Sequence, residues 1–307
     1  MLDRGHASVT FILITLGLDA LGVGLIAPIV PGLVERLAHL PPEVAAPWVG
    51  ALLAAYAAMQ FLMAPLLGAL SDRFGRRPVI LASVFGLGCD YVLLSLAPNL
   101  WWLFAGRLIA GATSANVAAA TAYIADVTPK QDRARLFGLI GATFGAGFVV
   151  GPAIGGLLGT YGLRLPFLAA AALSFVNVCY GLLVLPESLA REDRRPVTWA
   201  RANPFSLLAG IARDPTLWRL AAAWSCTWIG LGAVQSCLVL FTGYRFDWGS
   251  VLNGTLLAGL GVAQAVVEGG LLGRITPWLG ERRKAVLGYC LGALGYGVLA
   301  VAGQAGC

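Results

Sequence analysis

Long apolar runs separated by short charged stretches dominate the hydropathy pattern of this chain. A helix needs about 20 mainly apolar residues to cross the hydrocarbon core of a bilayer. Because backbone groups in lipid must be hydrogen-bonded within their own segment, runs of this length are expected to be α-helices. The pattern predicts nine spanning helices, at about 8–30, 47–70, 78–97, 101–124, 136–160, 164–185, 217–241, 250–272 and 285–303.

The composition indicates the same class of protein. Of the 307 residues, 58% are hydrophobic and 12% are charged, and the mean hydropathy is +0.80. Soluble domains carry about 25% charged residues, so the sequence predicts an all-α integral membrane protein. The six cysteines are scattered, without a CxxC pair or a Cys/His cluster. We therefore expect no disulfide, no metal site and no cofactor.

Most of the 21 Lys and Arg residues lie on one side of the predicted helices. With the N-terminus in the cytoplasm, seventeen of them face the cytoplasm, three lie outside and Arg107 lies within a span. Positive charge marks the cytoplasmic side of membrane proteins. We therefore expect a multi-pass protein of the inner (cytoplasmic) membrane with a cytoplasmic N-terminus. The net charge of +6 follows from this topology, so no nucleic-acid partner is predicted.

The longest loop, 187–216, is rich in charge and proline and is interpreted as a cytoplasmic linker. It would separate an N-terminal six-helix bundle, 1–186, from a partial C-terminal bundle of three helices, 217–307. A loose internal repeat agrees with two halves, because "GALSDRFGRRPV" at 68–79 recurs as "GLLGRITPWLGERRKAV" from Gly270. Repeated halves are common in transporters.

Three charged residues fall inside the predicted spans. Asp19 lies eleven residues from each end of the first span, which places it about 16 Å deep, near the midplane. Asp90 and Arg107 each lie seven residues from the same side, about 10 Å deep, and could form an ion pair. A charge at this depth costs at least about 2.5–3.5 kcal/mol, which indicates function. We predict Asp19 and Asp90 as proton-coupling residues; the alternative for Asp19 is a buried acid satisfied by polar neighbours.

Uncharged polar residues also lie within the spans. Some are expected to line a wet cavity for a small, drug-like substrate, and others only to bridge helices. The candidates for the cavity are Gln60, Thr113, Ser114, Asn116, Gln235 and Gln264. Thr121 and Asn177 are further polar positions of this kind, which either line the cavity or bridge helices.

Two glycine-containing stretches have spacings that predict close packing. Gly147, Gly151, Gly155 and Gly159 repeat every four residues and form a smooth face on one helix, where Pro152 favours a bend. This face serves either static packing or transport. In the 68–79 loop, Gly68 and Gly75 are expected to allow close backbone approach and a tight turn.

The same loop, G-x-L-S-D-R-x-G-R-R-P, resembles the cytoplasmic signature loop of the major facilitator superfamily. "LFAGRLIAG" (103–111) is similar to the superfamily's fourth-helix arginine motif, and "GFVVGPAIGG" (147–156) to its fifth-helix antiporter motif. "LDALGVGLIAPIVPGL" (18–33), "AYIADVT" (122–128) and "LPES" (185–188) resemble the tetracycline-efflux branch.

The resemblance implies the major facilitator superfamily fold, with a complete six-helix N-terminal half and three helices of the second half. It implies efflux of tetracycline or a similar amphipathic drug in exchange for protons, and an antiporter role for the helix with Gly147, Gly151, Pro152, Gly155 and Gly156. It also implies a cytoplasmic gate that changes its contacts during transport. The residues expected in this gate are Gly68, Asp72, Arg73, Gly75, Arg76, Arg77 and Asp126. The alternative for the charged loop is a cluster that only sets topology.

The chain departs from that branch in three respects. Complete relatives have twelve helices, so nine predict a C-terminally incomplete chain. Gln264 stands where the exporters carry a histidine in helix eight, and the ninth predicted helix has no acid. Two alternatives therefore remain open: a facilitator or exporter of other specificity without proton coupling, or a truncated, non-transporting membrane protein. An enzyme is not predicted, because His6 and His39 lie outside the spans and no nucleophile set or phosphate-binding loop is visible.

Overall fold

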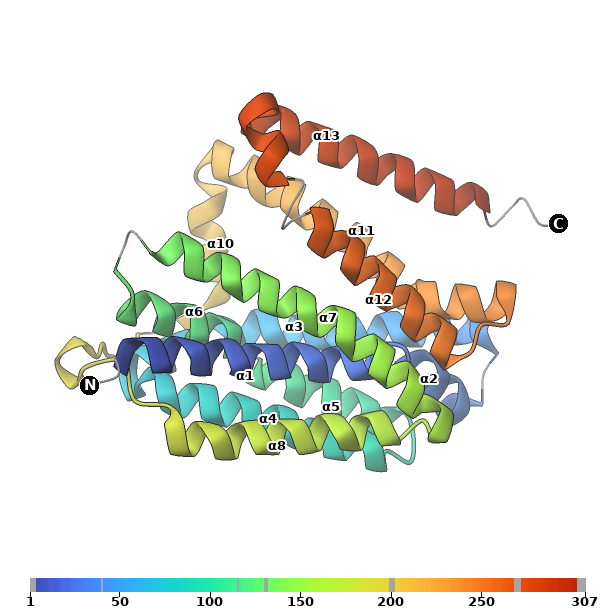
Figure 1. The fold of residues 1–307 in the computed structure, drawn as a ribbon, viewed down its shortest axis with the longest axis horizontal. Helices are drawn as coiled ribbons and strands as arrows, with labels where there is room; N and C mark the ends of the chain where they lie inside the picture. The colour runs from blue at the N-terminus through green and yellow to red at the C-terminus, as the bar shows by residue number, and fades with distance from the viewer. Residues whose placement is uncertain are drawn as a thin grey trace. The chain divides into compact units, whose positions relative to one another are not determined.

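The protein is described by a computed structural model that covers residues 4–39, 41–114, 116–129, 132–198, 202–267 and 272–302. In these ranges every regular element is a helix, which confirms the all-α prediction (Figure 1). The elements are α1 (Arg4–Ile26), α2 (Val30–Ala38), α3 (Pro42–Phe74), α4 (Arg76–Leu96), α5 (Leu100–Thr113), α6 (Asn116–Val127), α7 (Arg133–Tyr161), α8 (Leu165–Val184), η1 (Arg191–Asp193), α10 (Pro204–Ala212), α11 (Pro215–Phe246), α12 (Ser250–Val266) and α13 (Leu272–Ala302).

The chain forms two compact units, Met1–Gly261 and Val262–Cys307. The first unit contains α1 to α11 and most of α12, and the second contains α13. The division at 187–216 into two bundles stays a prediction.

Seven helices in the described ranges are long and apolar enough to cross a membrane. The predicted eighth and ninth spans correspond to α12, which has 17 residues, and to α13, whose apolar part is Ala285–Val298. A kink at Gly280, with φ 73°, divides α13 before this apolar part.

Three local details differ from the predicted boundaries. The first span ends at Ile26 and is followed by the separate helix α2, because Pro28 and Pro31 cannot donate the hydrogen bonds that a continuous helix needs. The fourth predicted span corresponds to α5 and α6 together; α5 ends at Thr113, with Ser114 as its C-cap, and the stretch Leu100–Val127 is counted as one of the seven candidate membrane spans. The loop 187–216 contains the helix α10, which begins where Asn203 accepts a hydrogen bond from the backbone of Phe205 at 2.9 Å.

Helix α8 shows how the bundle is organised for lipid. Its buried face carries small or polar residues such as Ala170, Ser174, Asn177 and Gly181. Several of its large apolar residues point outward, such as Leu183, which is 86% exposed, whereas Phe167 is buried in the core. Small and polar residues at helix contacts, with large apolar residues outside, are typical of helices that associate in a bilayer.

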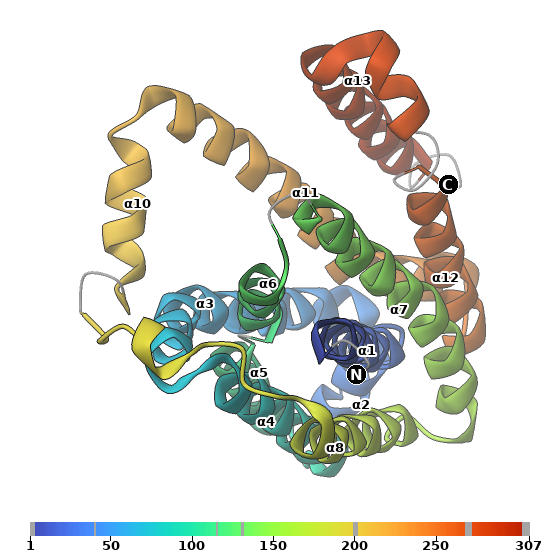
Figure 2. The same ribbon diagram turned by 60° about the vertical axis from the view of Figure 1, so that its left-hand side comes forward.

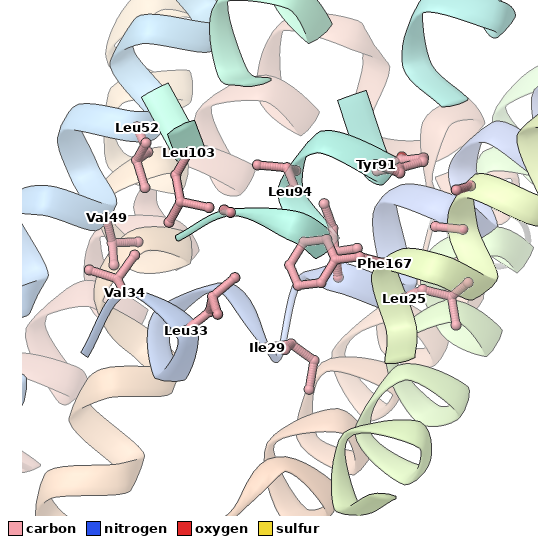
Figure 3. Packing of buried hydrophobic residues seen from close by; sticks show 14 of the residues in the cluster. Leu25, Ile29, Leu33, Val34, Val49, Leu52, Tyr91, Leu94, Leu103 and Phe167 are labelled. Atoms are coloured by element: carbon pink, nitrogen blue, oxygen red, sulfur yellow. The ribbon is translucent and has the colours of Figure 1, made fainter. Parts of the chain in front are cut away.

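Helix α1 packs against α7 and α8, while α4 packs against α8 and α5 (Figure 2). Two apolar clusters result. The first contains Leu25, Ile29, Leu33, Val34, Val49, Leu52, Tyr91, Leu94, Leu103 and Phe167, among others (Figure 3). The second contains Phe11, Ile12, Leu16, Val79, Ile80, Val84, Tyr123 and Ile124, among others. Along α1, Asp19 lies between the residues that join the second cluster and those that join the first.

Candidate functional site

Asp19 lies between the two apolar clusters and is only 3% exposed. The Asn177 side chain of α8 donates its amide to Oδ1 of Asp19 at 3.5 Å and to the Thr15 carbonyl at 3.3 Å. The Thr15 hydroxyl in turn donates to Oδ1 of Asn177 at 3.1 Å. Asn177, for which the sequence left cavity lining and helix bridging open, therefore bridges α8 to α1 and contacts its acid.

Asp90 on α4 and Arg107 on α5 form the ion pair that their equal depths predict. Nη2 of Arg107 lies 2.6 Å from Oδ2 of Asp90, and the Asp90 side chain is fully buried. The glycine before the arginine makes room, since a Cβ atom at Gly106 would lie 2.5 Å from Oδ1 of Asp90. That second oxygen, Oδ1, has no hydrogen-bond partner among the described residues.

Three of the candidate cavity residues make hydrogen bonds along their own helices. The Gln60 amide donates to the Tyr56 hydroxyl at 3.4 Å, within α3. Thr113 and Ser114 donate to carbonyls of their own helix, Ile109 at 2.9 Å and Gly111 at 2.8 Å, so both hydroxyls contribute to the break between α5 and α6. The side chains of Asn116 and Gln235 lie outside the described part of the structure.

Charges from three helices meet beside the turn between α3 and α4. Arg76 lies 2.6 Å from Asp72 and 3.1 Å from Asp126 on α6, and it donates to the Ser71 hydroxyl at 3.0 Å. We call Asp72, Arg76 and Asp126 the turn cluster. Unlike the Asp90–Arg107 pair, it is partly solvent-accessible, with side-chain exposures of 35% for Asp72 and 26% for Asp126.

Glu187 binds the turn between α3 and α4 and was not predicted as a site residue. Its Oε1 accepts the backbone N–H of Arg76, the first residue of α4, at 2.8 Å. Gly75 has φ 108°, and a Cβ atom there would overlap the Glu187 carboxylate. Gly75 therefore meets both needs, a positive φ and room for the carboxylate, as the sequence predicts for the turn.

The segment after α8 makes further contacts with the turn cluster. The Ser188 hydroxyl donates to Asp126 at 3.4 Å, and the backbone N–H of Arg195 donates to the Asp72 carbonyl at 3.1 Å. The Tyr123 hydroxyl of α6 donates to the Pro186 carbonyl at 3.1 Å. The start of the predicted linker is thus bound to α3 and α6.

Three other residues of the predicted gate lie apart from the turn cluster. Arg73 covers the ring of Phe74, with its guanidinium carbon 5.1 Å from the ring centre. Arg77 donates to the Leu182 carbonyl of α8 at 2.7 Å. The expected close approach at Gly68 is wrong, because a Cβ atom there would have no described atom within 4 Å.

The glycine face of α7 meets α1 directly. A Cβ atom at Gly147 would lie 2.6 Å from that of Ala20, and one at Gly151 would lie 2.7 Å from the Cα of Gly24. A Cβ atom at Gly155 would overlap the Leu25 carbonyl. The four-residue spacing therefore produces the close helix contact that it predicts.

A second face of α7 meets α12. A Cβ atom at Gly156 would lie 2.5 Å from the carbonyl oxygen of Ser250. A Cβ atom at Gly254 would overlap the carbonyl of Pro152, which lies within the continuous helix α7. Backbone contacts thus hold α7 on two sides.

Gln264 belongs to the second unit and is exposed. It marks the position where the exporters that the sequence resembles carry a histidine. The apolar part of α13, Ala285–Val298, contains no acid.

Comparison with known proteins places this geometry in a family. The sequence model of the Major Facilitator Superfamily matches residues 12–306. The chain is 44% identical over 302 residues to "Tetracycline resistance protein, class C" of Escherichia coli, covering 97% of this chain and 75% of that protein. It is 40% identical over 304 residues to the class G protein of Vibrio anguillarum, with coverages of 97% and 75%.

A solved structure has the same architecture. The crystal structure of the human organic anion transporter MFSD10 (TETRAN) superimposes with a TM-score of 0.69 at 25% sequence identity. The match covers 87% of this chain and 72% of that one.

Proposed function

The chain belongs to the Major Facilitator Superfamily, and we propose that it exports tetracycline or a similar amphipathic drug across the inner membrane in exchange for protons. The observation that carries this proposal is the 44% identity, over 97% of the chain, with a tetracycline resistance protein. The buried acids support proton coupling, because a charge is not kept at this depth without a use. The N-terminus would lie in the cytoplasm, as the distribution of basic residues predicts.

Asp19 is the proposed proton carrier. A proton from outside binds the Asp19 carboxylate and later leaves to the cytoplasm, while a drug molecule moves outward. Asp90 already has a cationic partner in Arg107, whereas Asp19 accepts a hydrogen bond from a neutral amide, that of Asn177. An ion pair opposes protonation of its acid more strongly than a neutral donor does, so we assign the exchanged proton first to Asp19.

The turn cluster is the proposed gate on the cytoplasmic side. Its three charges come from α3, α4 and α6, so relative movement of these helices would break or form its contacts. Because the cluster is partly exposed, its ion pairs cost little to exchange for water. The α7 face with Gly147, Gly151, Pro152, Gly155 and Gly156 would keep the path closed to leakage against α1 and α12.

The test is transport by the chain in everted vesicles or proteoliposomes. With an acidic lumen we expect tetracycline uptake, followed by its fluorescence, and proton release, followed by a pH dye. Asp19→Asn should abolish uptake driven by the pH gradient. Asp247→Asn, the same change at an exposed acid after α11, is the control and should leave uptake intact.

The remaining outcomes identify the alternatives. Uptake that does not depend on the imposed pH gradient would indicate a facilitator or exporter without proton coupling. A stable chain that takes up neither tetracycline nor other amphipathic drugs would mean a non-transporting membrane protein. Normal pH-driven uptake by Asp19→Asn would remove the assigned role of Asp19.

A further inference from the structure

Tyr91 is a polar residue of the bundle that none of the roles above uses. It follows Asp90 on α4, is 1% exposed, and packs in the first apolar cluster with Leu25 and Phe167 (Figure 3). Its hydroxyl has no hydrogen-bond partner among the described residues. A buried hydroxyl without a partner is unfavourable and rare in native proteins. Its retention here calls for a reason other than packing.

The Tyr91 hydroxyl lies against the α1 face that carries Asp19. A Cβ atom at Gly22 would lie 3.3 Å from the hydroxyl oxygen. Gly22 is three residues after Asp19, so both positions lie on the same side of α1, about one turn apart. The absence of a side chain at Gly22 is what lets the hydroxyl approach the helix.

Tyr91 also lies within electrostatic range of both acidic sites. The ionisable groups that act on it are Arg107 of α5, Asp90 of α4, Asp19 of α1 and Tyr56 of α3. Helix α8 adds the neutral Asn177 beside Asp19. Helix α7, which also packs against α1, has no ionisable side chain from 136 to 160. Asp19, Tyr91 and the Asp90–Arg107 pair therefore form one group of interacting charges and dipoles.

We propose that Tyr91 is a positioning residue for proton exchange: its hydroxyl donates a hydrogen bond toward ionised Asp19, directly or through one water. When Asp19 takes up a proton, the carboxylate becomes a carboxylic acid and the hydroxyl loses its charged acceptor. The tyrosine keeps its own proton throughout. Through Tyr91, the Asp90–Arg107 pair influences when Asp19 binds its proton. This inference rests on the proposed proton-coupled function.

Tyr91→Phe tests the proposal, because it removes the hydroxyl and keeps the ring. We expect the pH of half-maximal drug–proton exchange to move up by about one unit, the effect of one hydrogen bond to a charged group. The thermal unfolding temperature should change little, since the ring keeps its packing in the first apolar cluster. Tyr244→Phe, at a position 64% exposed on α11, is the matched control and should leave the pH profile unchanged.

Gly22→Ala is the second variant and decides the question if Tyr91→Phe does not fold. The added methyl would press on the hydroxyl, so we expect a smaller shift in the same direction. Gly50→Ala, where nothing lies within 4 Å, should have no effect. An unchanged pH profile in Tyr91→Phe or, if that variant does not fold, in Gly22→Ala overturns the role of Tyr91, while pH-driven wild-type uptake keeps the proposed function. Wild-type uptake that is independent of the pH gradient would instead overturn the function itself.

Discussion

The Asp90–Arg107 pair and the turn cluster bind opposite charges at the same short distance, 2.6 Å, in very different surroundings. Asp90 is fully buried and its only described partner is Arg107. In the turn cluster, Arg76 pairs with two acids, Asp72 and Asp126, which both reach solvent. Arg76 also donates to the Ser71 hydroxyl, and its backbone N–H donates to Glu187. The first pair is largely buried and has few hydrogen-bond partners, and the second has several partners and reaches solvent.

This difference determines what each set of charges can do. Removing one member of a buried pair leaves an uncompensated charge, which destabilises a protein by about 3–5 kcal/mol. Ion pairs that reach water contribute about 0–1 kcal/mol, because solvent replaces the lost partner. The buried pair is therefore suited to a fixed role in the bundle, and the turn cluster to contacts that break and re-form.

The largest expected effect is at Arg107. Arg107→Gln should lower the free energy of unfolding by about 3–5 kcal/mol, because Asp90 is left in an apolar site without its cationic partner. The double variant with Asp90→Asn should recover much of that loss, since neither charge remains. Thermal unfolding in detergent of both single variants and the double variant measures the coupling. Additive losses would show that the two residues do not act as a pair.

A smaller effect is expected at Gly106, where the charges stay but their space changes. Gly106→Ala should cost about 1–3 kcal/mol, because the new methyl would press on Asp90 and on Leu94. Gly145→Ala is the control, as nothing lies within 4 Å of that position on α7. Equal unfolding temperatures for the two variants would contradict the tight packing around the buried pair.

The smallest effect on stability is expected in the turn cluster. Asp72→Asn should change the free energy of unfolding by less than about 1 kcal/mol, because Arg76 keeps Asp126 and solvent. Transport should nevertheless slow, if the cluster is the gate, and the difference from wild type should shrink at high salt. A stability loss as large as that of Arg107→Gln would erase the distinction between the two regions.

The sequence predicts the helices well, because twenty apolar residues leave few other structures in lipid. The hydropathy pattern does not predict helix ends that are set by single residues. Pro28 and Pro31 end α1 early, and the Thr113 and Ser114 hydroxyls bond their own backbone where α5 ends. Helix α10 escaped prediction because it has only nine residues and lies in a loop rich in proline.

Of the candidate site, the Asp90–Arg107 pair is predictable, since depth alone puts both charges at one level. Glu187 and Asn177 are not, because their partners Arg76 and Asp19 lie 111 and 158 residues away in the chain. In the sequence, Glu187 is only an acid after α8 and Asn177 only an amide within it. Their partners become identifiable only when the packing of the helices is known. Gly68 is the opposite case, because the sequence predicts a close contact that the structure does not show. A glycine of a motif need not contact another helix in this structure.

Helix α7 touches α1 and α12 through backbone atoms, with Gly151 facing Gly24 and Gly156 facing Gly254. Interlocked side chains must change rotamer before two helices can slip past each other, and each such change has its own barrier. A glycine-on-glycine contact has no rotamers to change. These glycine contacts therefore allow α7 to shift along its neighbours without a rotamer change at those positions, while Thr143 against Gly17 and Val149 against Gly261 are the side chains that would have to adjust.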